Sequence, residues 1–147
     1  MKLRINHLLC IFMFFGVFPL QGYARSNAPE IEIQTLVKEA DSCRMSNNLY
    51  RALKLYEEAY QRKASTETFR AIIQCHYERG SYQRCIDLYR NVSPDSLTVK
   101  DLKMKFFCFS NIAQGDSAVH YGRLANSADP YDCKIVSKLA HHYNHAQ

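Results

Sequence analysis

The sequence predicts an all-α fold, a solenoid of three helical hairpins followed by one capping helix, and three observations lead to it. A pattern of small and aromatic residues recurs three times at an interval of 33 residues. Apolar residues follow helical spacing almost throughout after Pro29, and no segment alternates as a β-strand does. Turn-forming residues separate the helical segments. An interval of this length is typical of arrays in which each unit buries its apolar face against its neighbours.

The repeated pattern is clearest in the second helix of each hairpin. Its small, aromatic and small positions are held in turn by Ala52, Tyr56 and Ala59, by Cys85, Tyr89 and Val92, and by Ala118, Gly122 and Ala125. A small side chain lets two crossing helices approach closely, and the aromatic ring then fills the space between successive hairpins. We expect these positions to be structural, with glycine replacing the aromatic residue in the third copy.

The first stretch, residues 1–24, has the composition of a secretory signal. Two basic residues precede an apolar run over 8–20, and Gly22-Tyr23-Ala24 supplies the small residues that an export peptidase requires. The run is about 13 residues long, shorter than the roughly 20 that cross a bilayer core. We therefore expect a cleaved signal and an exported mature domain over 25–147 without an integral membrane span. An uncleaved anchor is the alternative.

Turn and cap residues place the first four helices. Asn27 is expected to cap a helix that has Pro29 near its first turn. Gly80 ends the third helix in the left-handed conformation that glycine tolerates best, and Pro94 follows the fourth. The four expected ranges are about 27–45, 49–63, 65–79 and 82–92.

The last three helices have similar signals. Thr98 and Asp101 have the spacing of a capping box at the start of the fifth helix. We expect Gly115-Asp116 to close that helix, the sixth to end near Ser127, and Asp129-Pro130 to open the seventh. Polar residues and histidines crowd the seventh helix, as expected for the solvated cap of a repeat array.

The segment from Asn48 to Ala59 resembles the second helix of a tetratricopeptide repeat, where an aromatic residue stands between two small ones at the spacing seen here. Gly80 and Tyr82 match the turn of that family in the second copy, and Pro130 matches its terminal proline in the third. The resemblance covers about residues 30–147. It implies the following units: repeats at 33–64, 66–97 and 99–130 and a capping helix at 131–147.

This sequence departs from the family pattern in two ways. The interval is 33 residues, whereas the family usually repeats at about 34. Gly115 also lies two residues closer to Ala118 than the second copy predicts. Ankyrin repeats share the shorter period, but the sequence lacks their Thr-Pro-Leu-His turn, so we reject them.

The resemblance implies that the first helix of each repeat lines a concave groove that binds a peptide or a partner helix. Tyr77 and Phe107 are the expected aromatic anchors, and Arg70 and Lys103 are the expected contacts to acidic or C-terminal groups. An ordinary amphipathic face without a ligand is the alternative. The candidate groove residues are Lys38, Arg44, Arg70, Gln74, Tyr77, Lys103, Phe107 and Asn111, and the same frame includes Gln34, Val37, Asp41, Glu67, Glu78, Lys100 and Met104.

Charge gives little support to binding of nucleic acid or of a membrane surface. Without Lys2 and Arg4 the 19 basic residues become 17, which against 14 acidic residues leave a formal charge of +3. The basic residues are interspersed with acidic ones and form neither a stripe nor a polybasic cluster. We therefore expect a protein or peptide partner and no nucleic acid.

Five cysteines follow the signal, and none belongs to a Cys-x-x-Cys pair. Cys75 and Cys85 are the favoured candidates for a bridge, since a helical hairpin could bring them together, but we prefer burial of most cysteines as small apolar residues. His141 and His145 stand four apart, a spacing that can hold a metal. No further ligand at helical spacing completes a four-ligand set, so we expect no metal.

The sequence contains no glycine-rich phosphate loop, nucleophile elbow or carboxylate pair at a strand end. We therefore expect no enzyme and no cofactor. The sequence predicts an exported interaction module or assembly adaptor of tetratricopeptide type in the periplasm or envelope of a bacterial cell, with secretion left open. The alternative is an extracytoplasmic sensor or input domain that is separated from a larger membrane receptor.

Overall fold

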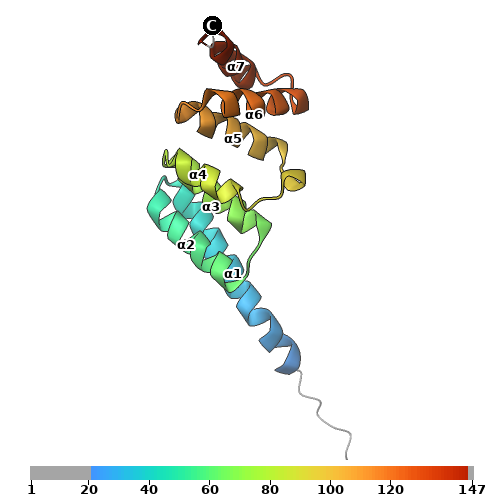
Figure 1. Cartoon of the computed structure of the whole chain (residues 1–147). Helices are drawn as coiled ribbons and strands as arrows, with labels where there is room; N and C mark the ends of the chain where they lie inside the picture. The colour runs from blue at the N-terminus through green and yellow to red at the C-terminus, as the bar shows by residue number, and fades with distance from the viewer. Residues whose placement is uncertain (1–20, 146–147) are drawn as a thin grey trace, which may run out of the picture. The chain divides into compact units, whose positions relative to one another are not determined.

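The computed structural model describes the backbone of residues 21–145 and the side chains of residues 29–144 (Figure 1). These residues form α-helices and one short 3-10 turn without a β-strand, so the predicted all-α class is confirmed. The seven helices of the described residues are α1 (Gln21–Met45), α2 (Leu49–Arg62), α3 (Thr66–Glu78), α4 (Tyr82–Tyr89), α5 (Val99–Asn111), α6 (Gly115–Ala128) and α7 (Cys133–His145), and the turn η1 (Pro94–Ser96) lies between α4 and α5.

The chain divides into two compact parts, residues 1–32 and 33–147, and α1 belongs to both. The prediction for the start of this helix is wrong: α1 begins at Gln21, before the expected cap Asn27, and Pro29 lies inside it. A proline inside a helix removes one backbone hydrogen bond, and here the helix continues on both sides of that local loss. Residues 1–20 of the predicted secretory signal lie outside the described residues. Its last residues, 21–24, belong to α1.

The turn that ends the first helix of each described hairpin has the same backbone geometry in all three. Asn47, Gly80 and Ala113 adopt positive φ angles of 60°, 74° and 58°. The amide of each donates to the carbonyl three residues earlier, and the following amide donates to the carbonyl five residues before itself. Because these residues lie 33 apart, the backbone turn recurs at the interval seen in the sequence.

The prediction that Gly115-Asp116 closes the fifth helix is wrong. α5 ends at Asn111, and Gly115 is the first residue of α6. The residue in the left-handed conformation is Ala113, although this conformation has a steric cost for alanine. The hydrogen bonds that close the turn determine which residue adopts it. Gly80 holds the corresponding position after α3, as predicted.

Side-chain caps begin α3 and α5. The Ser65 hydroxyl accepts from the amide of Thr68 at 3.1 Å. At α5 the Thr98 hydroxyl accepts from the amide of Asp101 at 3.2 Å, and the Asp101 carboxylate accepts from the amide of Thr98 at 2.9 Å. The predicted capping box is therefore confirmed.

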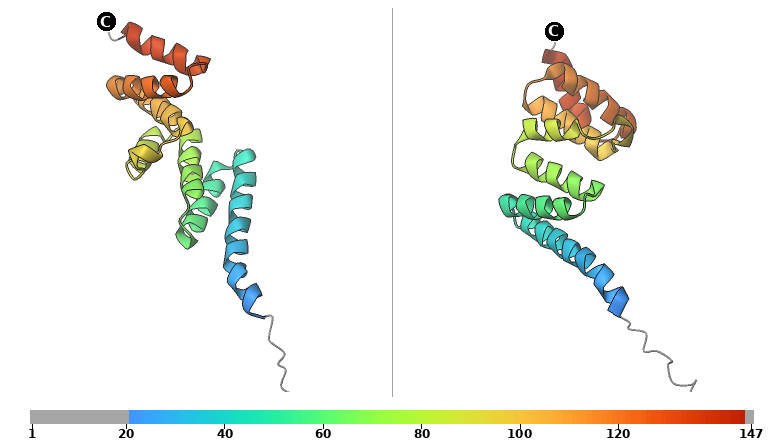
Figure 2. Two further views of the ribbon diagram at one scale, coloured as in Figure 1. Left: turned by 90° about the vertical axis from the view of Figure 1, so that its right-hand side faces the viewer. Right: turned by 60° about the horizontal axis from the view of Figure 1, so that its bottom comes forward.

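Successive helices from α2 to α7 contact one another and pack in sequential pairs, an arrangement consistent with a stack of hairpins (Figure 1, Figure 2). Two clusters of buried residues lie between them. The first cluster, formed by α1 to α3, is Ala40, Ala52, Leu53, Tyr56, Ile72 and Cys75. The second cluster, formed by α3 to α7, is Ile73, Cys85, Ile86, Tyr89, Met104, Phe106, Cys108, Phe109, Ala118, Ala125, Ile135 and Leu139.

Apart from Val92, which is half-buried, the small and aromatic positions of the repeated pattern are buried, and the buried residues are Ala52, Tyr56, Ala59, Cys85, Tyr89, Ala118, Gly122 and Ala125. Gly122 stands where the first two copies have tyrosine. A Cβ atom built on Gly122 would lie 2.9 Å from side-chain carbons of both Phe106 and Leu139. Phe106 and Leu139 therefore fill the space into which a side chain at this position would extend.

Candidate functional site

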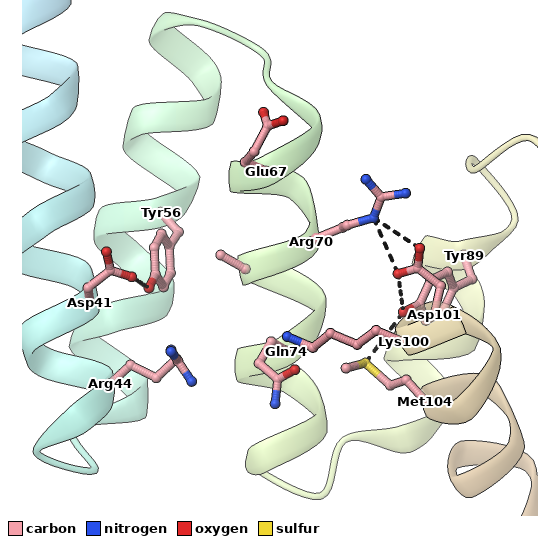
Figure 3. A pocket seen from close by; sticks show the side chains of 11 residues that line it. Asp41, Arg44, Tyr56, Glu67, Arg70, Gln74, Tyr89, Lys100, Asp101 and Met104 are labelled. Carbon is pink, nitrogen blue, oxygen red and sulfur yellow. Dashed lines mark hydrogen bonds and ion pairs between the residues drawn. The ribbon is translucent and has the colours of Figure 1, made fainter. Parts of the chain in front are cut away.

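A polar pocket of about 170 Å³ opens between α1, α3 and α5, which are the first helices of the three hairpins (Figure 3). Its most buried members are Tyr56 of α2, Tyr89 of α4 and Asp101 of α5, with 1%, 3% and 3% of their surfaces exposed. The other lining residues are Asp41, Arg44, Glu67, Arg70, Ala71, Gln74, Lys100 and Met104. Acidic and basic side chains of α1, α3 and α5 therefore line this pocket together with two buried tyrosines.

Asp101 connects the α3, α4 and α5 sides of the polar pocket. The Tyr89 hydroxyl donates to its Oδ1 at 3.0 Å, and Arg70 Nε donates to its two carboxylate oxygens at 3.0 and 3.3 Å. Arg70 Nη2 also donates to the carbonyl of Ser96 at 2.9 Å. Since Asp101 also caps α5, a single buried carboxylate links three helices (Figure 3).

The charge state of this network follows from its contacts. Burial alone would raise the pKa of Asp101, but hydrogen bonds from Thr98 and Tyr89 and the charge of Arg70 outweigh burial and hold that pKa below its ordinary value. The pKa of Tyr89 is raised well above its usual value, first by burial and then by the Asp101 carboxylate. At neutral pH a carboxylate therefore accepts from a neutral phenol, and both groups keep the helices in place.

A second network occupies the α1 side of the pocket. The Tyr56 hydroxyl donates to Asp41 Oδ1, and the pKa of Tyr56 is raised by its burial and then by this hydrogen bond. Glu78 Oε1 accepts from Arg44 Nη1 at 3.0 Å and from Gln74 Nε2 at 2.8 Å. Glu78 thereby joins the end of α1 to α3.

Three groups in the polar pocket are available to form an ion pair or a hydrogen bond with a ligand. Lys100 and Glu67 are exposed and form no ion pair within the described residues. Gln74 Oε1 is buried without a hydrogen-bond partner among these residues, an arrangement that costs about 1–3 kcal/mol. Figure 3 shows the Lys100 side chain extending from α5 toward α3, where Gln74 lies. A ligand in the pocket would therefore find one cation, one anion and one buried acceptor.

Part of the predicted groove lines the polar pocket. The shared residues are the candidates Arg44, Arg70 and Gln74 and, from the same helical frame, Asp41, Glu67, Lys100 and Met104. Lys38 is exposed on α1 outside the lining. Lys103 lies between two carboxylates, with its Nζ 2.7 Å from Asp129 and 2.6 Å from Asp132. Lys103 therefore ties α5 to the segment before α7, a role that the spacing within α5 does not indicate.

The two predicted aromatic anchors do not converge on the pocket. Tyr77 is half-buried against the second cluster and meets Tyr82 edge to face, with ring centroids 5.7 Å apart. Phe107 lies beside Phe106, with centroids 5.2 Å apart, and Asn111 Nδ2 donates to the carbonyl of Phe107 at 2.7 Å. These three predicted groove residues thus stabilise packing and helix structure outside the polar pocket.

A second, open hollow of about 520 Å³ lies between Phe107 and α7. Its remaining lining residues are Cys133, Lys134, Ser137, Lys138 and His141. His142 Nε2 lies 2.8 Å from Ser110 Oγ, so this imidazole joins α7 to α5. Of the predicted pair His141 and His145, the side chain of His145 lies outside the described residues, and no group of three metal-ligating side chains occurs among those that are described.

The favoured bridge between Cys75 and Cys85 is not formed, and the five described cysteines are free thiols. Cys75 belongs to the first cluster, whereas Cys85 belongs to the second. The reason is that α3 packs on both α2 and α4, and Cys75 is on the side that meets the earlier hairpin. Burial is the main reason that the pKa of Cys75 is raised to about 11, as expected for a thiol that packs as a small apolar group.

Sequence reasoning missed Asp101 and Tyr89 as members of the pocket, since it treats Asp101 as a cap and Tyr89 as a packing residue. The capping-box spacing is the one local signal for Asp101. No spacing rule indicates that Arg70, which is 31 residues earlier, binds the same carboxylate. That contact depends on how α3 and α5 are placed by the packing of the helices between them.

No protein-family model matches the sequence, and no curated protein matches it either. No helix within residues 21–145 combines the length and the apolar character needed to cross a membrane. The structure defines an all-helical protein whose seven described helices pack in sequential pairs, with a polar pocket that three of them line.

Proposed function

We propose that the chain is an interaction module of tetratricopeptide-repeat type that binds a peptide segment or a partner helix along α1, α3 and α5. The polar pocket carries this proposal, because the first helices of all three hairpins contribute side chains to it. The turn that recurs at Asn47, Gly80 and Ala113 supports the repeat architecture, since it places the three hairpins in equivalent local geometry.

The size and chemistry of the pocket favour a peptide over a small molecule. Its volume of about 170 Å³ is below the roughly 300–1,000 Å³ of most small-molecule sites, so it suits one side chain or a short backbone stretch. Lys100 would donate to a carbonyl or carboxylate of the ligand, and Glu67 would accept from a donor group. Gln74 Oε1 would accept from a backbone amide, which would satisfy an acceptor that is buried without a partner in the described structure.

We propose a role in binding without catalysis. Most ionisable groups of the pocket hold the helices together: Asp101 binds Arg70 and Tyr89, and Asp41 binds Tyr56. The setting that we propose is the periplasm or cell envelope, where the module would act as an assembly adaptor. That setting rests on the signal-like composition of residues 1–24.

A charge reversal in the pocket tests the proposal. The purified chain would be used to retain partners from a bacterial envelope extract, and the affinity of a retained protein would then be measured by calorimetry. Lys100→Glu should weaken binding at least about tenfold, which corresponds to about 1.4 kcal/mol. Lys54→Glu is the matched control, because Lys54 is an exposed lysine of α2 outside the pocket lining.

Two results would contradict the proposal. Equal affinity of the wild type and Lys100→Glu would place the binding surface outside the polar pocket. Failure of the wild-type chain to retain any envelope protein would argue against an interaction module in that compartment. Far-ultraviolet circular dichroism of both variants would establish that each is folded, so that lost binding is assigned to the changed charge.

A further inference from the structure

Lys105 of α5 is a buried basic residue with 9% of its surface exposed, and no other lysine or arginine of the described residues is buried to that degree. Its Nζ lies 4.2 Å from the centroid of the Tyr121 ring on α6 and 5.6 Å from the centroid of the Tyr89 ring on α4. The ammonium group therefore lies over aromatic rings from the two helices that flank α5.

This ammonium group has no anionic partner within the described part of the chain. Its contacts there are the two rings, without an ion pair or a hydrogen bond. Asp101 lies one turn earlier on α5, at a spacing that often gives an ion pair. Its carboxylate instead binds Arg70 and Tyr89.

Packing does not account for the charge of Lys105. The residue 33 positions earlier is Ile72, which is 6% exposed and belongs to the first cluster. The residue 33 positions before Tyr121 is Leu88, which packs against that cluster. Apolar side chains thus fill the two equivalent positions of α3 and α4. A buried charge without an ionic partner is unfavourable, and the contacts with the rings offset only part of that cost.

The Lys105 ammonium group is open to an incoming ligand. Among the described residues, the buried polar atoms without a hydrogen bond are Gln74 Oε1, His76 Nδ1 and Asn126 Oδ1. Lys105 Nζ and the Tyr121 hydroxyl also have no hydrogen bond in the described structure, yet neither is among these buried atoms. Both groups are therefore in contact with solvent, as for side chains that bury an apolar stem and expose a polar end.

We propose that Lys105 and Tyr121 form a receptor for a carboxylate group of a protein partner, an aspartate or glutamate side chain that reaches the surface between α4 and α6. The ammonium group donates charge-assisted hydrogen bonds to this carboxylate, and the Tyr121 hydroxyl donates one more. One carboxylate neutralises the single charge of Lys105. Its burial makes the attraction stronger than it would be at an exposed lysine.

The carboxylate receptor is separate from the polar pocket, since neither Lys105 nor Tyr121 lines that pocket. The inference rests on the proposed function in one respect only, that the partner is a protein or peptide. The two assignments can therefore fail independently of one another.

Fluorescence anisotropy with two labelled peptides tests the receptor on the full chain. One peptide contains six glutamates, and its neutral match contains six glutamines. At low ionic strength the wild type should bind the glutamate peptide at least about tenfold more tightly than the glutamine peptide. Lys105→Met keeps the length and the apolar stem of the side chain, and it should remove most of that difference. The control Lys54→Met changes an exposed lysine of α2 and should preserve it.

Thermal melts of the same variants separate a binding role from a structural one. Lys105→Met replaces an unpaired buried charge with an apolar side chain, so its Tm should fall by no more than about 3 °C or should rise. A larger fall would mean that the ammonium group chiefly stabilises the fold through the two rings, and it would overturn the proposal.

Three binding results would also overturn it. The first is equal affinity of the wild type for the two peptides. The second is a preference for glutamate that survives in Lys105→Met. If Lys100→Met abolishes that preference, the carboxylate binds in the polar pocket, and the proposed function stands without the receptor. The third is binding of free succinate, measured by calorimetry, without binding of the glutamate peptide, which would assign the site to a small carboxylate instead of a protein.

Discussion

Tyr56 and Tyr89 hold the same position in two successive hairpins, yet their hydroxyl groups bind in opposite directions along the chain. Tyr56 donates to Asp41 of the preceding helix α1, and that aspartate is exposed. Tyr89 donates to Asp101 of the following helix α5, and only 3% of that residue is exposed. The repeated pattern thus accounts for burial of the ring, whereas the position of the nearby acid decides which helices the hydroxyl connects.

The third copy extends this comparison. Gly122 has no ring, and the adjacent space belongs to Phe106 of α5 and Leu139 of α7. The same volume is therefore filled from the second helix in two hairpins and from neighbouring helices in the third. Close packing requires that the space be filled but does not require that one position fill it.

The largest effect is expected when the third copy is made to match the first two. Gly122→Tyr would place its Cβ 2.9 Å from carbons of Phe106 and Leu139 before the ring is added. We expect destabilisation by at least about 3 kcal/mol, at the upper end of the range for overpacked cores. The midpoint of urea denaturation would measure it.

Gly115→Ala is the matched control, because a Cβ at Gly115 meets no atom within 4 Å among the described residues. This change should leave the free energy of unfolding within about 0.5 kcal/mol of the wild type, as for other surface substitutions. A folded Gly122→Tyr variant with the wild-type midpoint would show that Phe106 and Leu139 can move aside and that the three copies are interchangeable.

A smaller effect should separate the two tyrosines. Tyr89→Phe removes a hydrogen bond to a buried carboxylate and should lower the free energy of unfolding by about 1.5–3 kcal/mol. Tyr56→Phe removes a bond to an exposed carboxylate, which water can solvate, and should cost about 0.5–1.5 kcal/mol. Equal losses in parallel urea denaturations would mean that the direction of the hydroxyl contact has no energetic consequence.

The smallest effect concerns pH. The folded pKa of Asp101 lies below its ordinary value, so this carboxylate stabilises the fold above the unfolded pKa of about 3.9, and the contribution is lost as pH falls through the folded pKa. The stability difference between the wild type and Asp101→Asn should therefore be full at neutral pH and should shrink below about pH 4. Urea denaturation between pH 7 and pH 3 would measure this difference, and parallel curves for the two proteins would contradict it.

Local signals predicted much of the secondary structure. The capping box at Thr98 and Asp101 and the left-handed residue Gly80 are confirmed, because both depend on contacts within a few residues. The start of α1 and the turn at Ala113 were missed. In each case a residue with an unfavourable intrinsic preference, a proline inside a helix or an alanine with positive φ, is accommodated by the surrounding hydrogen bonds.

The candidate site was predictable only in part. Helical frame and family resemblance placed Arg44, Arg70 and Gln74 on the first helices of the hairpins, and these residues line the polar pocket. The same reasoning gave Lys103 a partner-binding role, although two aspartates of the chain itself neutralise it. A helical frame defines a face of each helix but contains no information on which distant side chain reaches that face.

By itself the sequence determined the helical class, the 33-residue interval and most of the turns, because each follows from interactions among residues that are close along the chain. Only the tertiary structure decided that Tyr89 and Arg70 share Asp101 and that Phe106 fills the space beside Gly122. These contacts join residues of different helices. The packing of successive helices creates them, and their partners are set by the shape and charge of both surfaces together.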